Sequence, residues 1–283
     1  MEKKFDIYEA ITSRICAELE KGLIPWEKPW FGSEGGAISG ATGKPYSLMN
    51  QMLLLKPGQW FTFNQVKALK ATIRKGEHCS MVVFWKQIPI TEEGPDGEKV
   101  QKMVPMLRYF NVFHESQIDG LPEKEDRPSI EHIDPCEEAE AIVNGYITRS
   151  GVILDRTDVS DEAYYSPARD AVNVPCMEQF SKQSEYYSTL FHELVHSTGH
   201  VSRLNRLTAP AYFGSPEYSK EELVAEIGAA ALNNRCSIES HSSFRNSAAY
   251  IQSWLHALKN DKRLLVSATG KAEKAVNMIL GAA

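Results

Sequence analysis

The sequence has few cysteines, and their arrangement excludes two common ways of stabilising a small domain. Five cysteines are scattered over 283 residues, and no two of them form a Cys-x-x-Cys pair. A disulfide framework requires an even set of cysteines, and a cysteine zinc knuckle requires closely spaced pairs. We therefore expect reduced and mostly buried thiols at Cys16, Cys79, Cys136, Cys176 and Cys236.

Long apolar runs are also missing. No stretch approaches the roughly 18–20 apolar residues that a membrane-spanning helix needs. The first residues, Met1-Glu2-Lys3-Lys4, lead into alternating charged and apolar residues and contain no apolar core of a signal peptide. Hydrophobic residues make up 42% and charged residues 24% of the chain, which excludes a wholly disordered protein. We expect a globular, cytoplasmic protein.

Neither half of the chain carries a strong excess of basic residues. Residues 1–118 have a formal charge of +2 and residues 119–283 one of −8, within a net charge of −6. A charge difference between halves favours two domains with different partners, but +2 alone does not indicate a nucleic acid. Residues 118–128 are charged, contain proline and glycine and hold few apolar residues, which is typical of a linker. The sequence thus predicts a first domain over 1–118, a linker over 119–135 and a second domain over 136–283.

The spacing of apolar residues predicts a mixed α+β fold. An apolar residue recurs every four positions at Ile7, Ile11, Ile15 and Leu19, which is typical of one helix face. The segment 219–222, Ser-Lys-Glu-Glu, matches a capping box and predicts a helix start. By the same reasoning we expect helices at 5–22, 47–56, 63–72, 136–149, 184–198, from 219 onward, 243–259 and 269–280, strands at 80–86, 107–113 and 151–155, and a hairpin of 163–166 with 171–174.

One motif in the second half carries recognisable chemistry. His192-Glu193-Leu194-Val195-His196 is a His-Glu-x-x-His motif on the long helix predicted over 184–198. Residues four apart share a helix face, so His192 and His196 can reach one metal ion. Glu193 then lies beside the open coordination position, where a carboxylate can take a proton from a polarised water and pass it to a leaving amine. The alternative is a helix with an unrelated surface histidine pair.

The sequence leaves the third ligand open. A His-Glu-x-x-His-x-x-Gly-x-x-His pattern would need histidine at position 202, which is Ser202. His200 falls two residues short, so we expect it at the helix end or beside a ligand. Zinc peptidases of the thermolysin type use a glutamate from a later helix, and Glu222 on an acidic predicted helix is our choice. Glu226 is the rival ligand or supports a histidine, and Glu222 could instead merely close the capping box with Ser219.

The first half pairs tryptophan with basic residues. Four of the five tryptophans lie within the first 85 residues. Aromatic rings on which bases stack, interleaved with cations that meet phosphates, are what binding of a single-stranded nucleic acid requires. Tryptophans in a small α+β domain are more often part of the core, so both interpretations stay open. The candidate DNA-binding residues are Trp26, Lys28, Trp30, Lys44, Tyr46, Arg74, Lys75, Trp85 and Lys86.

Taken together, the motifs resemble those of the ArdC-type antirestriction proteins of plasmids, phages and other mobile elements. In the first half the resemblance rests on Pro25-Trp26 with Pro29-Trp30, Gly43-Lys44-Pro45-Tyr46 with Asn50, Arg74-Lys75-Gly76-Glu77, and Val82-Val83-Phe84-Trp85-Lys86. In the second half it rests on Tyr164-Tyr165-Ser166-Pro167, the segment from His192 to His200, and Glu221-Glu222-Leu223-Val224-Ala225-Glu226. It covers nearly the whole chain.

This resemblance implies an N-terminal domain that binds single-stranded DNA, followed by a zincin-like metallopeptidase domain. It adds Asn50 to the candidate DNA-binding residues. It also implies a divalent metal, expected to be zinc, held by His192, His196 and a glutamate. The role implied for the whole protein is to protect incoming DNA from host restriction.

Two other functions fit the same residues. The chain could be a DNA-coating module whose metal is not catalytic, or a cytosolic regulatory zinc peptidase whose first half recognises protein. If the chain cleaves peptides, Glu193 is the expected general base, and the strand at 171–174 is the expected edge for an extended substrate. Loss of protection in Glu193→Ala with DNA binding intact would argue against the coating module, and negligible DNA affinity would favour the regulatory peptidase.

Overall fold

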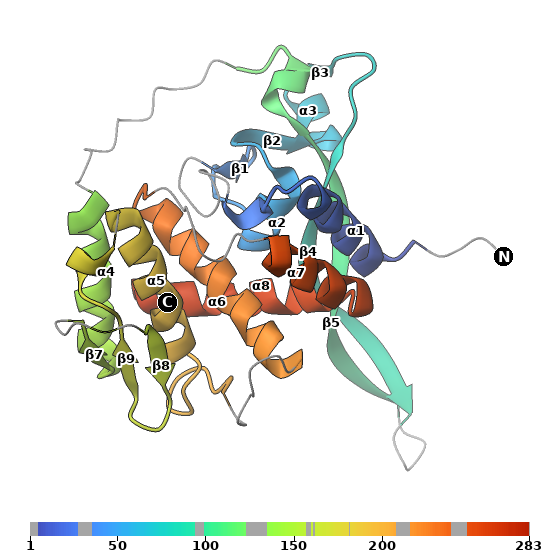
Figure 1. Cartoon of the computed structure of the whole chain (residues 1–283). Coiled ribbons are helices and arrows are strands. Elements are labelled where there is room, and N and C mark those ends of the chain that lie inside the picture. The colour runs from blue at the N-terminus through green and yellow to red at the C-terminus, as the bar shows by residue number, and fades with distance from the viewer. Residues whose placement is uncertain are drawn as a thin grey trace.

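The computed structural model of the chain describes residues 5–27, 36–93, 99–122, 135–156, 160, 162–180, 182–207, 216–238 and 248–282. The helices are α1 (Ile7–Glu20), α2 (Leu48–Leu54), α3 (Phe63–Ala68), α4 (Pro135–Ser150), α5 (Gln183–Ser197), α6 (Pro216–Arg235), α7 (Ala248–Asn260) and α8 (Leu264–Leu280). The strands are β1 (Ala37–Ser39), β2 (Gly58–Thr62), β3 (Thr72–Ile73), β4 (Ser80–Glu93), β5 (Lys99–His114), β6 (Ile118–Asp119), β7 (Ile153–Asp155), β8 (Tyr164–Ser166) and β9 (Ala171–Asn173). Short 3-10 helices are η1 (Pro25–Glu27), η2 (Glu115–Gln117) and η3 (Met177–Gln179), and Figure 1 shows the arrangement.

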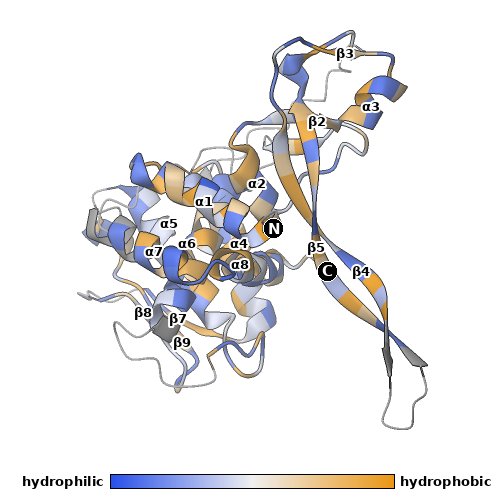
Figure 2. Ribbon diagram, turned by 90° about the vertical axis from the view of Figure 1, so that its right-hand side faces the viewer, coloured by the Kyte–Doolittle hydropathy of each residue, from blue (hydrophilic) through white to orange (hydrophobic). Residues whose placement is uncertain are grey.

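The first half is built on a sheet with the strand order β1-β2-β5-β4. β1 runs parallel to β2, whereas the β2–β5 and β5–β4 pairs are antiparallel. β4 and β5 pair without interruption from Ser80↔Val112 to Glu93↔Lys99. They form a long twisted ribbon that projects beyond the helical body (Figures 1 and 2). Because residues 84–91 and 101–106 are exposed or half-buried, this part of the ribbon offers both faces to solvent.

The second half is mainly helical. α5 contacts α6 and also the strands β8 and β9, while α8 contacts α4 and α6. The small sheet has the order β7-β9-β8, with β7 parallel and β8 antiparallel to β9. The predicted hairpin is therefore confirmed, but the prediction that 171–174 forms a free edge is wrong. β9 lies between its two neighbours, and the edge strand that contacts α5 is β8.

One hydrophobic core joins the two halves. It includes Ile11 of α1 and Met52 of α2 as well as Leu194 of α5. Trp26 in η1 is 0% exposed and packs edge-on against Trp254 of α7, with the ring centroids 5.3 Å apart. The N-terminal helices thus pack against the C-terminal helices, although the first half also buries smaller apolar clusters of its own around Trp60 and Phe61.

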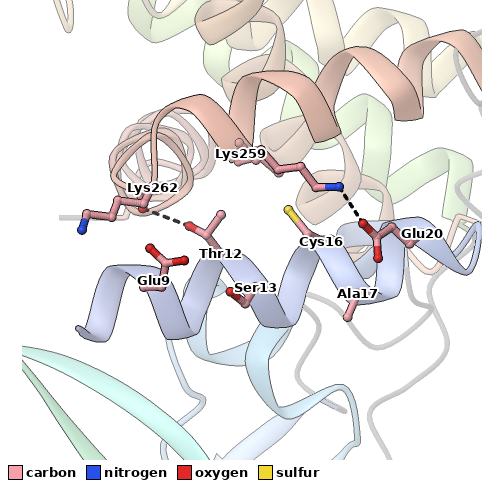
Figure 3. Close-up of a pocket in the computed structure, with 9 residues that line it drawn as sticks. Glu9, Thr12, Ser13, Cys16, Ala17, Glu20, Lys259 and Lys262 are labelled. Atoms are coloured by element: carbon pink, nitrogen blue, oxygen red, sulfur yellow. Dashed lines mark hydrogen bonds and ion pairs between the residues drawn. The ribbon is translucent and has the colours of Figure 1, made fainter. Parts of the chain in front are cut away.

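A cavity of about 300 Å³ lies between α1 and the C-terminal end of α7, where polar contacts join the two segments. Thr12 donates its hydroxyl to the backbone carbonyl of Lys262 at 3.0 Å, and Lys259 pairs with Glu20 at 2.7 Å; Figure 3 marks both contacts with dashed lines. Cys16 lies on the wall of the same cavity. These contacts tie the first helix to the last third of the chain.

The cysteines are free, but they are less buried than the sequence suggested. Cys16 and Cys236 are buried, Cys136 and Cys176 are half-buried, and Cys79 is exposed.

The predicted α+β fold class is confirmed, while several boundaries differ. β4 and β5 extend well beyond 80–86 and 107–113. α6 begins at Pro216, so the prediction that Ser219 caps this helix is wrong, and α8 begins at Leu264 instead of 269. Residues 243–247 of the expected seventh helix lie outside the described residues. Within the described part of the chain, no helix has the length and apolar character needed to cross a membrane.

Candidate functional site

Helices α5 and α6 bring three predicted ligand side chains together. His192 and His196 lie one turn apart on α5, with their Nε2 atoms at 3.0 Å from each other. Glu222 on α6 places Oε2 3.5 Å from Nε2 of His192 and Oε1 3.3 Å from Nε2 of His196. Ligand atoms of a tetrahedral zinc ion are about 3.3 Å apart, since each lies about 2.0–2.1 Å from the metal. This triangle therefore has the size and the donor set that one divalent ion requires.

The close approach of α5 and α6 depends on a glycine. A Cβ atom at Gly228 of α6 would lie 2.8 Å from a methyl group of Val195 on α5, well inside van der Waals contact. On the same helix as Val195, Leu190 and Leu194 are completely buried. The apolar side of α5 is thus fixed in the core, and its histidine side is turned toward α6.

Each histidine also has a carboxylate at its other ring nitrogen. Glu226 Oε1 lies 3.5 Å from Nδ1 of His192, and Glu221 Oε1 lies 3.4 Å from Nδ1 of His196. A carboxylate in this position fixes the ring of a metal-binding histidine and raises its basicity. The geometry therefore separates the three glutamates. Glu222 faces both Nε2 atoms, whereas Glu221 and Glu226 lie behind the rings.

Arg206 connects the carboxylate of Glu221 to the end of α5. Its Nη2 donates to Oε1 of Glu221 at 2.8 Å, and its Nε donates to Oε2 at 3.2 Å. It also donates to the hydroxyl of Thr198 at 2.8 Å and to the backbone carbonyl of Val195 at 2.9 Å. Sequence reasoning missed both Glu221 and Arg206, because only the folded chain brings residues 206 and 221 to the same helix end.

The acidic surroundings shift the pKa values of the site. Burial by itself lowers the pKa of His196, but hydrogen bonds to Glu221 and Glu222 and the charge of Glu193 raise it to about 10. Burial raises the pKa of Glu222, but its contacts with the two histidines bring it well below the usual range. Without a cation, His196 therefore carries a proton at neutral pH. A metal ion that binds there must displace this proton.

Two further residues predicted for this site, Glu193 and His200, lie on α5 and just after its end. Glu193 is buried, and its charge helps to raise the pKa of His196 on the next turn of α5. His200 follows the end of α5, where its Nδ1 lies 2.7 Å from the hydroxyl of Ser202. Among the interactions that the structure describes for His200, none reaches His192 or His196.

A second network ties the edge strand β8 to the end of α5. Arg203 donates its Nε to the backbone carbonyl of Ser197 at 2.8 Å and its Nη1 to Oδ2 of Asp170 at 3.0 Å. Tyr165 of β8 donates its hydroxyl to Oδ1 of the same Asp170 at 2.7 Å. The hydrogen bond from Arg203 holds the pKa of Asp170 below its usual range. Strand β8 is thus fixed relative to the histidine helix.

Two of the predicted DNA-binding residues are core residues instead. Trp26 is fully buried against Trp254 and offers no ring face to a base. Asn50 is 0% exposed. Its Nδ2 donates to the carbonyl of Val83 at 2.9 Å, and its Oδ1 accepts from the N–H of Val83 at 2.8 Å. Both predictions are corrected, because these side chains hold η1 and α2 in place and face away from solvent.

The other described candidates are accessible to a ligand. Arg74 is exposed and pairs with Asp119 at 2.8 Å, which leaves it less free to meet a phosphate. Lys28 and Trp30 lie outside the described residues. The exposed or half-buried candidates are Lys44, Tyr46, Arg74, Lys75, Trp85 and Lys86.

Two aromatic residues that the sequence reasoning did not select stand exposed on the ribbon. Phe84 is 44% exposed and Phe110 is 47% exposed, and their ring centroids lie 5.8 Å apart. The ring of Tyr46 lies 6.1 Å from that of Phe84. Alternation along a strand places such residues on a common face, but the sequence alone does not tell which face is open to solvent.

Two family models match the chain, one in each half. The model of a zincin-like metallopeptidase matches residues 138–271, and the model of the N-terminal domain of anti-restriction factor ArdC matches residues 5–113. Among solved structures, the antirestriction protein ArdC of plasmid R388 is 35% identical to this chain. Its metal-free structure superposes with a TM-score of 0.75 over 97% of both chains, and its Mn(II)-bound structure with 0.76 over 98% of both.

Curated relatives are similar along nearly the whole chain. The uncharacterized protein y4eC of Sinorhizobium fredii is 32% identical over 95% of this chain and 90% of its own length. A DNA primase TraC of Escherichia coli is 33% identical over 99% of this chain, which is 20% of the primase. The chain therefore spans only about a fifth of that relative.

Proposed function

This chain belongs to the ArdC family of antirestriction proteins, and we propose that it protects incoming DNA in the cytoplasm by joining single-strand binding to metal-dependent peptide cleavage. The N-terminal half would bind the DNA, and the zincin-like half would hold the metal. The observation that carries the proposal is the group formed by His192, His196 and Glu222, whose ligand atoms all lie within 4.8 Å of one another.

We infer that these three side chains hold one divalent cation. Two imidazoles and a carboxylate are the ligand set of thermolysin-type zinc sites, which makes Zn²⁺ the expected metal. Mn²⁺ is the second candidate, because a Mn(II)-bound structure exists for the R388 relative. When bound, such a cation would polarise a water molecule and the carbonyl group of a peptide.

The surrounding residues would then perform the proton transfers. Glu193 follows His192 directly and is buried, so its carboxylate would accept a proton from the attacking water and deliver it to the departing amine. Glu226 and Glu221 would keep the two imidazole rings in place. The edge strand β8 would receive an extended peptide by backbone hydrogen bonds.

Metal content tests the proposed ligands. Purified protein is expected to contain or take up about one Zn²⁺ or Mn²⁺ per chain, as measured by isothermal titration and elemental analysis. The variant His192→Ala/His196→Ala should take up none at this site while keeping its circular dichroism spectrum. Unchanged metal uptake in a folded double variant would overturn the assignment.

To test whether catalysis contributes to protection, a variant is needed that keeps the shape of the site. Glu193→Gln replaces the proposed base by an isosteric amide. We expect it to bind metal and DNA normally and to lose protection of a plasmid transferred into a restricting host. Full protection by Glu193→Gln would instead favour the coating function, in which the metal has no catalytic role.

Binding to nucleic acid can be measured independently of the metal. Fluorescence anisotropy with single-stranded and duplex oligonucleotides of equal length, over a salt series, is expected to show salt-sensitive binding that favours the single strand. Absence of binding to either form at low salt would make the regulatory peptidase the better account.

A further inference from the structure

The two faces of the β4–β5 ribbon differ in chemistry. Because the register is unbroken and pairs even-numbered with even-numbered residues, side chains sort by parity. We call the face that holds the even-numbered residues of 82–90 and 102–110 the even face. The odd face holds the odd-numbered residues of 81–91 and 101–111.

The even face carries all the cations of these segments. They are Lys86, Lys102 and Arg108, and no acidic residue lies on this face within the same segments. All three side chains are exposed, and no ion pair with a described residue neutralises any of them. The even face is thus a strip of positive charge on a chain whose net charge is −6.

The even face also carries a row of aromatic rings. Phe84 and Phe110 lie 5.8 Å apart in an edge-to-face pair, and both are almost half exposed. Tyr46 continues the row beside Phe84 at 6.1 Å. Arg108 is the cross-strand partner of Phe84, so the charges interleave with the rings. Base-stacking surfaces with interleaved cations are the combination that tracks a single strand.

The odd face lacks this combination. It carries no charged residue in the same segments. Val83 and Leu107 lie in the shared core and cover its inner end against the helices. Trp85, the cross-strand partner of Leu107, and Met103 farther out are each 57% exposed, but a phosphate would find no cation on this face beside them.

We propose that a single-stranded nucleic acid lies along the even face, with bases stacked on Phe84 and Phe110 and phosphates met by Lys86 and Arg108. This assignment rests on the proposed single-strand binding and places it on one face of the ribbon. Trp85, a candidate from sequence, lies on the other face and has no part in it. A duplex stacks its bases on one another, so its base faces cannot reach the phenylalanine rings.

The neighbouring residues Phe84 and Trp85 provide a matched pair of variants. Both are exposed aromatic residues of β4, yet they point to opposite faces. Binding of fluorescein-labelled oligothymidylate of 20 nucleotides would be measured by anisotropy for the wild type, Phe84→Ala/Phe110→Ala and Trp85→Ala. We expect the double variant to weaken binding about tenfold or more, since each stacked base contributes substantially. Trp85→Ala should bind within about twofold of the wild type.

A charge variant tests the phosphate contacts separately. Lys86→Gln/Arg108→Gln should reduce the slope of log Kd against log salt by about 1.4, because each single-strand phosphate contact contributes about 0.7. The melting temperature and the metal content of every variant would be compared with the wild type to confirm that the fold is kept.

The outcomes separate this inference from the proposed function. If the wild type binds no single strand, the proposed function fails. If the wild type binds and Phe84→Ala/Phe110→Ala binds equally well, or Trp85→Ala weakens binding as much, the even-face assignment is overturned. An unchanged salt slope in Lys86→Gln/Arg108→Gln would also overturn it.

Discussion

At the scale of single residues, the proton on His196 governs how the site takes up a metal. The surrounding carboxylates raise its pKa to about 10 against the effect of burial. Because a cation must displace this proton, binding of Zn²⁺ at pH 8 is expected to release about one proton and to tighten as the pH rises toward 10. Titration calorimetry in buffers of different ionisation enthalpy measures the release directly.

The contact between Glu221 and His196 supplies a variant for the same measurement. Glu221→Gln removes one of the groups that raise the pKa of His196, so less proton release is expected at pH 8. Glu9→Gln, an exposed carboxylate on α1, should behave as the wild type. Heats of binding that do not depend on the buffer would show that His196 is already neutral, contrary to this expectation.

Asp170 gives a prediction about stability and pH. Its pKa is lowered chiefly by the hydrogen bond from Arg203, so its contribution to stability is present above about pH 4 and is lost as the pH falls through the lowered value. Asp170→Asn should lower the free energy of unfolding by about 1–3 kcal/mol at pH 7. Asparagine tolerates the left-handed backbone at this position, where φ is 48°, so the change removes the charge and one hydrogen-bond acceptor without straining the backbone.

The comparison is made by thermal melts of both proteins between pH 7 and pH 3. The two melting temperatures are expected to approach each other toward the acid end, because the charge of Asp170 in the wild type begins to be neutralised there. If the two melting temperatures differ by the same amount at every pH, the ion pair between Asp170 and Arg203 does not set the stability of the hairpin.

Residue types and spacing were enough to find the metal group but not its full environment. The i, i+4 spacing of His192 and His196 predicts a shared helix face, and the structure bears this out. The choice between Glu222 and Glu226 required coordinates, because one turn of helix decides whether a carboxylate faces Nε2 or Nδ1. Trp26 was misjudged for a related reason. A tryptophan beside basic residues looks the same in sequence whether its ring is exposed or buried.

At the scale of elements, the distance between α5 and α6 determines whether the site closes. Gly228→Ala would place a methyl group 2.8 Å from Val195 and push the helices apart. We expect a loss of about 1–3 kcal/mol in the free energy of unfolding, as for other overpacked contacts. Weaker metal binding should accompany it, since Glu222 lies on the displaced helix. Denaturant unfolding and calorimetry measure the two effects.

Gly270 on α8 is the matched control. It also lies within a helix, but a Cβ atom there would meet nothing within 4 Å. Gly270→Ala should therefore be neutral or stabilising by up to about 1 kcal/mol, because alanine favours helix. Equal effects of the two substitutions would mean that helix propensity, and not the contact with Val195, dominates at Gly228.

Element boundaries were harder to predict than the elements themselves. The segment 219–222 matches a capping box, yet α6 starts at Pro216, a residue type that fits the first turn of a helix. β4 and β5 continue outward into a solvent-exposed ribbon, where no buried face imposes an apolar alternation that could be recognised. Pro89 and Pro105 lie within this ribbon. Prolines are tolerated in edge strands, but in a sequence they predict that a strand ends.

At the scale of the whole molecule, the shared core raises the question of how independent the two halves are. The predicted boundaries at 118 and 136 stay a prediction, whereas the packing of Trp26 against Trp254 shows that core residues cross between the halves. No single segment of sequence reveals such a contact, since the two tryptophans are far apart in the chain. The consequence is that the N-terminal and C-terminal halves should unfold together.

The buried cysteines report on this coupling, because Cys16 belongs to the first half and Cys236 to the second. Trp26→Ala should destabilise the protein by about 3–5 kcal/mol, as for other large-to-small substitutions of a buried aromatic residue. If the halves unfold as one unit, the labelling rates of both cysteines, measured by mass spectrometry, will rise by a common factor of about 100 or more. Cys79 is already exposed and should label at the wild-type rate. Faster labelling of Cys16 alone would instead mean that the first half opens while the second half stays folded.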